Sequence, residues 1–316
     1  MPSLNLISFV IPAMNEEDSI EELYSRIAMN MSNVENFDFE VLFIDDGSDD
    51  ATWEKMKALY HANPSRVRAF RLRKNFGKSQ ALNLGFSKCA GDLVFTMDAD
   101  LQDDPDEIPR FIAKLEQGYD LVSGWKENRK DPKSKTLPSK LFNKVTSLVT
   151  GIELNDFNCG FKLYRKTVIE SIEVYGELHR YIPVLAHDYG FKIAEIGITH
   201  HERKHGVSKF GWERYTRGLL DLLTVLVTTR YLKKPSHLFG GLGLLFGLLG
   251  FLSLSYLILL WLFGSSGIGG RPLLLFGALS TMVSVQLISL GLLSELINKN
   301  QDFKSLSAAA ISEELS

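Results

Sequence analysis

The chain has 316 residues, a formal net charge of −3 and an isoelectric point near 6.2, so it lacks the basic character of nucleic-acid-binding proteins. Its two cysteines, Cys89 and Cys159, have no metal-ligand spacing, which is typical of a reduced, cytosolic setting. No basic segment precedes an apolar core at the start of the sequence, so we expect no signal peptide.

Apolar runs rich in strand-forming residues alternate with helical patterns along the first half of the sequence. This alternation predicts a doubly wound, mostly parallel α/β sheet. The expected strands are Leu4–Ile11, Phe39–Ile44, Val67–Leu72 and Asp92–Met97. The expected helices begin at Asn15, Ala51, Lys78 and Pro105, and the first continues to about Met31.

The following hundred residues are less regular. We expect strands at Tyr119–Ser123, Phe161–Leu163 and Lys192–Ile198. The segment Glu127–Lys140 is polar, basic and interrupted by two prolines, which predicts a loop. Leu141–Val149 has the pattern of a short amphipathic helix.

Two C-terminal segments are long and apolar enough to cross a membrane. No charged side chain occurs from Leu238 to Phe263 or from Pro272 to Ser294, and a spanning helix needs about 20 apolar residues. Lysines flank the pair at positions 233, 234, 299 and 304, whereas only Arg271 lies between the two segments. The positive-inside rule therefore predicts an inner-membrane protein whose N-terminal domain and both termini are cytoplasmic.

These patterns divide the chain into four parts. We expect an α/β domain over residues 1–209, which ends in a basic loop, and an amphipathic helix at the membrane interface over 210–231. A transmembrane hairpin is expected over 232–298, with spans at about 238–263 and 272–296, and a cytoplasmic tail over 299–316. Small residues on the first span favour self-association into a homo-oligomer, namely Gly240, Gly241, Gly243, Gly247 and Gly250.

The stretch FTMDADLQDDP places two carboxylates where an apolar strand ends. Asp98 and Asp100 are two residues apart, so an extended segment points both to the same side. Two like charges this close repel each other, and a hard divalent cation relieves that repulsion. Asp103, Asp104 and Asp106 follow and are expected to add to the negative field. The alternative is a solvated acidic turn, but a turn needs only one such residue.

Polar residues also follow the first two strands. Pro12, Asn15 and Glu16 follow the first, and Asp45 and Asp46 follow the second. Carboxylates at these positions suit ribose hydroxyls and base N–H groups, and ligands bind at the carboxyl ends of the strands in such sheets. The sequence has neither the G-x-G-x-x-G pattern of dinucleotide enzymes nor a P-loop, so a nucleoside whose diphosphate binds a metal ion at Asp98 and Asp100 is favoured.

Seven segments then carry a family resemblance: IPAMNEE, FIDDGSDD, NFGKSQALNLGF, TMDADLQDDP, NCGFKLYRK, HRYIP and RKHGVSK. Taken together and in order, they resemble the inverting glycosyltransferases of the GT-A fold, in the branch of dolichol-phosphate mannose synthase and the bacterial polyprenyl-phosphate glycosyltransferases. The C-terminal hairpin resembles the bacterial membrane-anchored members. HRYIP stands where processive relatives carry Q-x-x-R-W, which indicates a single sugar transfer.

The resemblance implies a role for each motif. Nucleotide-sugar contacts would come from Pro12, Asn15, Glu16, Asp45, Asp46, Lys78 and Asp98. The metal and diphosphate motif would be Asp98, Asp100 and Gln102, with Mg²⁺ or Mn²⁺ as the ion. The acceptor phosphate would be held by Arg180, Arg203, Ser208 and Lys209. Asp98, Asp100 and Arg203 also count among the catalytic residues. Asp156 is a further catalytic candidate that would orient a group near the reacting carbon, and a loop cap is the alternative.

The implied reaction transfers one hexose, with inversion, from a nucleotide sugar to polyprenyl (undecaprenyl) phosphate in the bilayer. The acceptor phosphate is largely ionised at neutral pH because its second pKa is near ~6, so no strong general base is needed. Glucose from UDP-glucose is the first expectation for the donor. GDP-mannose, UDP-linked amino-arabinose derivatives, a glycerolipid or glycan acceptor, and a non-catalytic membrane scaffold remain alternatives.

Overall fold

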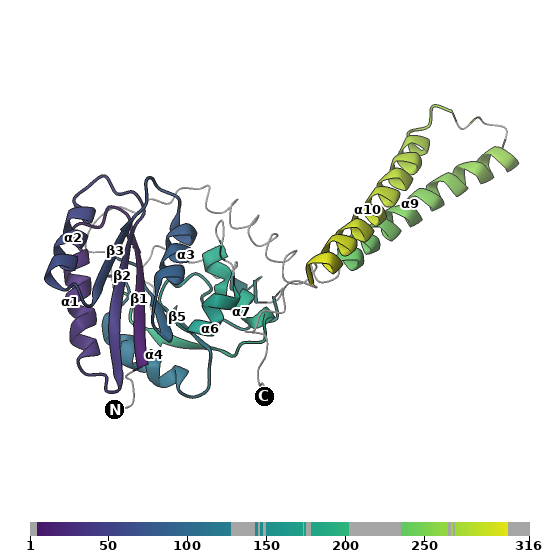
Figure 1. Ribbon diagram of the computed structural model, residues 1–316. Coiled ribbons are helices and arrows are strands. Elements are labelled where there is room, and N and C mark those ends of the chain that lie inside the picture. The colour runs from purple at the N-terminus through teal and green to yellow at the C-terminus, as the bar shows by residue number, and fades with distance from the viewer. Residues whose placement is uncertain are drawn as a thin grey trace. The chain divides into compact units, whose positions relative to one another are not determined.

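The computed structural model describes residues 5–127, 143–144, 146–147, 150–172, 174, 178–201, 235–264, 267 and 269–302. The described residues up to His201 form one compact unit, and those from Pro235 onward form a second (Figure 1). Several predicted features lie outside the described residues: Arg203, Ser208, Lys209, the helix over 210–231 and the tail from 303.

The first unit is built on one seven-stranded sheet with the order β3-β2-β1-β4-β6-β5-β7 (Figure 1). All neighbouring pairs are parallel except those of β6, which is antiparallel to both β4 and β5. The mostly parallel α/β sheet is therefore confirmed. The strands are β1 Asn5–Ala13, β2 Phe37–Asp45, β3 Val67–Arg71, β4 Leu93–Thr96, β5 Leu121–Lys126, β6 Lys162–Arg165 and β7 Ile193–Ile198.

Helices connect these strands, as parallel neighbours require. They are α1 Ile20–Met31, α2 Thr52–Ala62, α3 Lys78–Lys88, the 3₁₀ turn η1 Pro105–Glu107, α4 Ile108–Leu115, α6 Lys166–Ser171, the 3₁₀ turn η2 Leu178–Tyr181 and α7 Ile182–Asp188. The expected start of the first helix at Asn15 is wrong. Asn15 has φ +54°, in the left-handed region, so a turn precedes the helix, which begins at Ile20.

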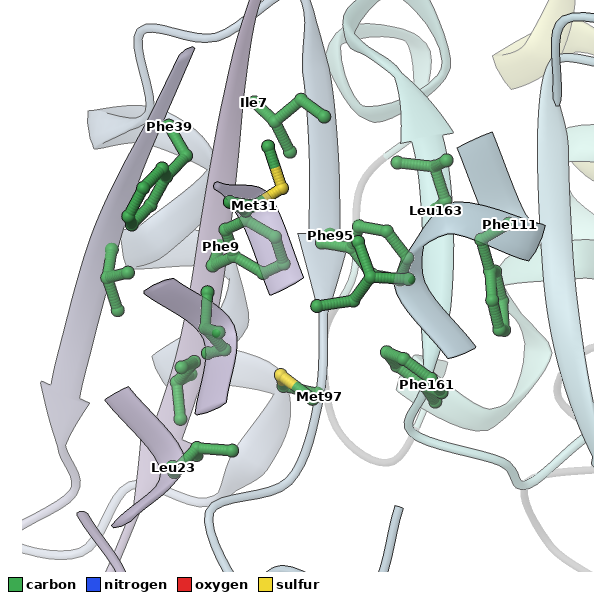
Figure 2. Packing of buried hydrophobic residues seen from close by; sticks show 14 of the residues in the cluster. Ile7, Phe9, Leu23, Met31, Phe39, Phe95, Met97, Phe111, Phe161 and Leu163 are labelled. Carbon is green, nitrogen blue, oxygen red and sulfur yellow. The ribbon is translucent and has the colours of Figure 1, made fainter. Parts of the chain in front are cut away.

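The central strands are buried on both faces, which explains their continuous apolar runs. Alternate residues of β1, among them Phe9, point to a core that is covered by α1 and α4 (Figure 2). Phe9 stacks on Phe95 with ring centroids 5.3 Å apart, and Phe95 contacts Phe161 at 5.1 Å and Phe111 at 5.2 Å. This aromatic cluster links β1, β4 and the residue just before β6 to α4, and it fixes the position of β4, after which the acidic motif follows.

Strand register brings the predicted motifs to one edge of the sheet. Ala13 at the end of β1 pairs with Asp45 at the end of β2, and Val10 pairs with Thr96 at the end of β4. Because β6 runs the opposite way, its first residue, Lys162, pairs with Thr96 at this same edge. The edge therefore combines the carboxyl ends of the parallel strands with the start of an antiparallel one.

The second unit is a pair of helices, α9 Pro235–Phe263 and α10 Pro272–Asp302. The segments Leu238–Phe263 and Pro272–Leu296 are long and apolar enough to cross a membrane, and most of their residues are not buried within the protein. Both segments agree with the predicted spans. The described chain thus combines an α/β domain with two apolar helices that fit a transmembrane hairpin.

Glycine residues let these two helices approach each other closely. A Cβ atom on Gly243 would lie 3.1 Å from the backbone oxygen of Ser284, and one on Gly250 would lie 3.0 Å from that of Gly277. Gly247 faces the Ser284 side chain in the same way. Three of the five glycines expected to serve self-association therefore pack against the partner helix of their own hairpin.

Candidate active site

The acidic motif forms a tight turn directly after β4. Leu101 has φ +57°, which is rare for a residue with a branched side chain, and it is 2% exposed within the core. The Asp100 carboxylate accepts a hydrogen bond from the Gln102 amide at 3.3 Å. The buried Leu101 side chain thus anchors the turn in the core. The side chains of Asp98, Asp100 and Gln102 are partly exposed at the edge of the sheet.

Asp98 is held between a lysine and a glycine. The Lys78 ammonium, on the first residue of α3, forms an ion pair with Asp98 Oδ1. On another side of the carboxylate lies Gly160, where an added Cβ would be 2.8–2.9 Å from Asp98 Oδ1, Cγ and Oδ2. The Asp98 side chain is 35% exposed and that of Lys78 is 29% exposed. The carboxylate is therefore restrained by its neighbours and open to a ligand.

The three carboxylates after the motif are neutralised by distant partners, which corrects the expectation that they add to the negative field. Asp103 is buried and pairs with Lys126 of β5 at 3.3 Å. Asp104 pairs with Arg26 of α1, and Asp106 shares the same guanidinium at 3.0 Å. Burial alone would raise the pKa of Asp103, but Lys126 and His200 outweigh burial and hold that pKa well below its usual range. These ion pairs thus reduce the negative charge that the three carboxylates add to the site.

The loop after the motif is also tied to the end of β7. The Thr199 amide and hydroxyl both donate to Glu107 Oε1 at 3.1 Å. The His201 amide donates to the Gln102 carbonyl at 2.8 Å, and His201 Nε2 lies 2.6 Å from an Asp104 carboxylate oxygen. These contacts fix the position of Gln102 and connect the motif to the residues that precede the predicted acceptor-phosphate segment.

The turns that follow β1 and β2 are bound to each other. The Asn15 amide donates to Ser48 Oγ at 2.9 Å, and Asn15 Oδ1 accepts from the Asp49 amide at 3.1 Å. The Glu16 amide donates to Thr52 Oγ1 at 2.8 Å. Half-buried Pro12 lies just before this pair of turns. The residues predicted to contact the nucleotide therefore come together at the same edge.

Asp45 and Asp46 make internal contacts at this edge. Asp45 is fully buried; it accepts from the Ser48 amide at 2.8 Å and pairs with Arg71 at 3.1 Å. Asp46 accepts from the amides of Phe76 and Gly77 at 2.8 and 2.9 Å, which positions the start of α3. Burial raises the pKa of Asp46, and the two amide hydrogen bonds oppose that effect. Their predicted nucleotide contacts remain predictions.

Asp156 lies in a buried loop that Glu195 of β7 holds. The Asp156 amide donates to Glu195 at 2.9 Å, and Asp156 Oδ1 accepts from the Asn158 amide at 3.0 Å. The nearby Lys162 ammonium is buried and donates to the Cys159 carbonyl, and burial lowers its pKa. Arg180, predicted at the acceptor phosphate, is buried in η2.

Several of these residues were not identified from the sequence as part of the site, namely Arg26, Arg71, Lys126, Lys162, Gly160 and Glu195. Lys162 and Gly160 belong to the segment NCGFK, which had carried the family resemblance without an assigned role. The others come from distant parts of the chain and carry no local signal.

The donor atoms at Asp98 and Asp100 are hard carboxylate oxygens, which fit Mg²⁺ or Mn²⁺. Among the described residues, no group of three His, Cys, Asp or Glu side chains is arranged to hold a metal ion. Two carboxylates are enough for ions that take most of their ligands from substrate phosphates and water. The fit is therefore to a cation that binds with a diphosphate.

The chain is similar to known proteins over most of its length. The model of the family described as "Glycosyl transferase family 2" matches residues 8–173. Dodecaprenyl-phosphate galacturonate synthase of Rhizobium johnstonii is 39% identical over 295 residues, which cover 92% of this chain and 87% of that protein. Undecaprenyl-phosphate 4-deoxy-4-formamido-L-arabinose transferase of Pseudomonas fluorescens is 35% identical over 298 residues, which cover 94% of this chain and 86% of that protein.

Among solved structures, glucosyl-3-phosphoglycerate synthase from Mycobacterium tuberculosis, in complex with Mn²⁺ and UDP-glucose, has a TM-score of 0.53 at 20% identity. The match covers 71% of this chain and 79% of that one, and it shows the fold alone. The chain belongs to glycosyl transferase family 2; it is a glycosyltransferase, and the relatives described above are polyprenyl-phosphate sugar transferases.

Proposed function

We propose that this enzyme transfers a single sugar from a nucleotide donor to a polyprenyl phosphate, with inversion at the anomeric carbon. The observation that carries the proposal is the extent of the match to the polyprenyl-phosphate sugar transferases. It covers 92–94% of the chain, so the unmatched share is too small to contain either apolar helix. The membrane segment that a bilayer-resident acceptor requires is thus part of the similarity.

The chemistry follows from the charges of the two substrates. The acceptor phosphate is an ionised nucleophile, so the enzyme's task is to position two anions and to stabilise the leaving diphosphate. Asp98, Asp100 and Gln102 would hold Mg²⁺ or Mn²⁺, which supplies Lewis-acid stabilisation of that leaving group when bound. The Lys78 ammonium would pair with a donor phosphate, and Asp156 would orient a group near the reacting carbon. Arg180, Arg203, Ser208 and Lys209 would bind the acceptor phosphate.

The membrane arrangement follows from the acceptor. A long isoprenoid stays in the bilayer, so its phosphate is met at the surface. By the positive-inside rule, the lysines that flank the hairpin support a cytoplasmic catalytic domain and cytoplasmic termini. The predicted amphipathic helix over 210–231 would lie in the interface. Of the other predicted interfacial segment, Leu141–Val149, the described residues 143, 144, 146 and 147 are helical, as is residue 150 just beyond it.

A donor panel tests the reaction and names the sugar. Full-length protein in detergent is mixed with undecaprenyl phosphate, Mg²⁺ or Mn²⁺, and one radiolabelled donor at a time, and label is followed into the organic phase. UDP-glucose is the first expectation. The panel also needs GDP-mannose and the nucleotide-linked forms of galacturonate and 4-deoxy-4-formamido-L-arabinose, the two sugars that the relatives' names give.

We expect metal-dependent transfer from one donor, and loss of that transfer in Asp100→Ala. Transfer without added metal, or transfer that survives the substitution, would contradict the assigned role of the motif. Nucleotide binding without transfer from any donor would refute the polyprenyl phosphate acceptor and lead to tests of glycerolipids and glycans. Absence of nucleotide binding would contradict a transferase and leave a scaffold role.

Gly160→Ala tests whether the backbone beside Asp98 is part of the site. The added methyl group would lie within 3 Å of the carboxylate and push it from its place. Because misplacing a reacting or stabilising group by about 1 Å costs about 10²-fold in rate, we expect a loss of that order in transfer with little change in thermal stability. Gly240→Ala is the control, since nothing lies within 4 Å of its Cβ position. Equal rates in the two variants would refute the role of Gly160.

A further inference from the structure

We propose that the Lys78 ammonium is a built-in counter-ion for Asp98, and that it moves to the donor diphosphate when the nucleotide binds. The divalent cation then binds tightly only together with the nucleotide. The inference rests on the proposed function and deepens it, because it concerns how metal and donor depend on each other. It starts from one contact, the ion pair between Lys78 Nζ and Asp98 Oδ1.

This ion pair competes directly with a metal ion. A cation that coordinates Asp98 Oδ1 must displace the ammonium or lie beside it, and two positive charges at one oxygen repel each other. The carboxylate cannot turn away toward Gly160, because the space there is too small even for a Cβ atom. Lys78 and a metal ion therefore compete for the same carboxylate.

The surrounding charges add to this competition. Two further lysines, Lys126 and Lys162, are largely buried, and the negative charge of Asp98 favours the charged form of each. Lys78 in turn acts to lower the pKa of Lys162. Of these two, Lys126 has its own partner in Asp103. The carboxylates of the motif thus lie in a setting that already contains positive charge, so a divalent cation alone gains little there.

Binding of a diphosphate changes the competition between the Lys78 ammonium and the metal ion at Asp98. Asp98, Asp100 and Gln102 would supply only part of the metal's coordination shell, so the remaining ligands would come from the donor or from water. The added negative charge attracts the metal and gives the ammonium a new partner, since lysine is a common phosphate ligand. Lys78 is the first residue of the 11-residue helix α3, whose N-terminus also favours an anion. The lysine can therefore exchange a carboxylate for a phosphate.

The test measures Mn²⁺ binding to the full chain in detergent by the EPR signal of the free ion, first with Mn²⁺ alone and then with UDP or GDP. Wild type is expected to bind Mn²⁺ weakly alone and much more tightly with one of the nucleotides. Lys78→Gln is expected to bind Mn²⁺ alone about tenfold more tightly than wild type, because a charge that repels the ion is removed. The same variant is expected to gain less from the nucleotide.

Two control variants separate this mechanism from a general charge effect. Lys78→Arg keeps a cation at the position and is expected to bind Mn²⁺ alone as weakly as wild type. Lys74→Gln removes a nearby charge that contacts the Phe76 ring, 5.1 Å from its centroid, and is also expected to match wild type.

The inference is overturned if Lys78→Gln binds Mn²⁺ alone no more tightly than wild type, or if wild type binds the ion equally well with and without nucleotide. Either result leaves the proposed transfer intact as long as Mn²⁺ and nucleotide still bind. Failure of wild type to bind Mn²⁺ in every condition would instead refute the metal assignment, and this inference with it.

Discussion

Asp98→Asn is expected to lower the rate of sugar transfer by about 10²–10³-fold, the loss seen when one group that stabilises developing charge is removed. Asparagine keeps the size of the side chain, so the contact with Gly160 is preserved and the turn after β4 should fold normally. What is lost is the negative charge that would hold both the metal ion and Lys78. Initial rates in the radiolabel assay at saturating Mn²⁺ measure the effect.

Asp106→Asn is the matched control. Its carboxylate belongs to the same acidic run, but it is mostly exposed and pairs with Arg26 instead of facing the motif. We expect its transfer rate to stay close to that of wild type. The assignment of Asp98 would be wrong if Asp98→Asn kept more than about one-tenth of the wild-type rate, since that loss is under about 1.4 kcal/mol of transition-state stabilisation.

Lys126→Met is expected to destabilise the catalytic domain by about 3–5 kcal/mol, because it leaves the Asp103 carboxylate buried without its cation. The two side chains are 15% and 1% exposed, so solvent screens the pair little. Midpoints of urea unfolding in detergent, followed by circular dichroism, measure the change. Adding Asp103→Asn to the variant removes the buried charge and is expected to recover part of the loss.

An exposed ion pair provides the contrast for this prediction. Lys55→Met breaks a surface pair with Glu21, and its unfolding midpoint is expected to stay near that of wild type. A shift in Lys126→Met as small as that in Lys55→Met would refute the structural role of the buried pair.

The contribution of the buried Asp103–Lys126 pair to folding stability changes with pH in a direction that can be predicted. In wild type the pKa of Asp103 is lowered on folding, so its contribution to stability is present above the ordinary carboxyl pKa and is lost as the pH falls below it. Without Lys126, burial raises that pKa, so protonation of Asp103 favours the folded variant. The difference in stability between wild type and Lys126→Met is therefore expected to shrink as the pH falls from 7 to about 4.

Much of the fold was predictable because its signals are local. Apolar runs at Phe39–Ile44 and Asp92–Met97 predicted buried strands, and uncharged segments predicted the two apolar helices. The alternation of strands and helices was enough to place Asp98 and Asp100 at the carboxyl edge of a parallel sheet, because parallel strands end on the same side. The family motifs predicted a nucleotide-sugar site at this edge, and the comparisons confirmed the family.

What could not be predicted depends on contacts between residues far apart in the chain. The acidic run looks uniformly negative in sequence. In the structure, Arg26 of α1 pairs with Asp104 and Lys126 of β5 pairs with Asp103. The glycines of α9 look like a surface for self-association, yet three of them face α10. Asn15 looks like the start of a helix until its contact with Ser48 selects a turn. In each case the deciding partner has no fixed spacing in sequence.

The sequence by itself determined the class of fold, the edge of the sheet at which the site is predicted and the two carboxylates at that edge, because hydrophobic periodicity and residue type act over a few neighbouring positions. Only the tertiary structure decided which charges are paired there. The antiparallel strand β6 brings Gly160 and Lys162 beside the motif, and α3 brings Lys78 onto Asp98. Electrostatic balance at a site depends on distances in space, and these are set by the packing of the whole domain.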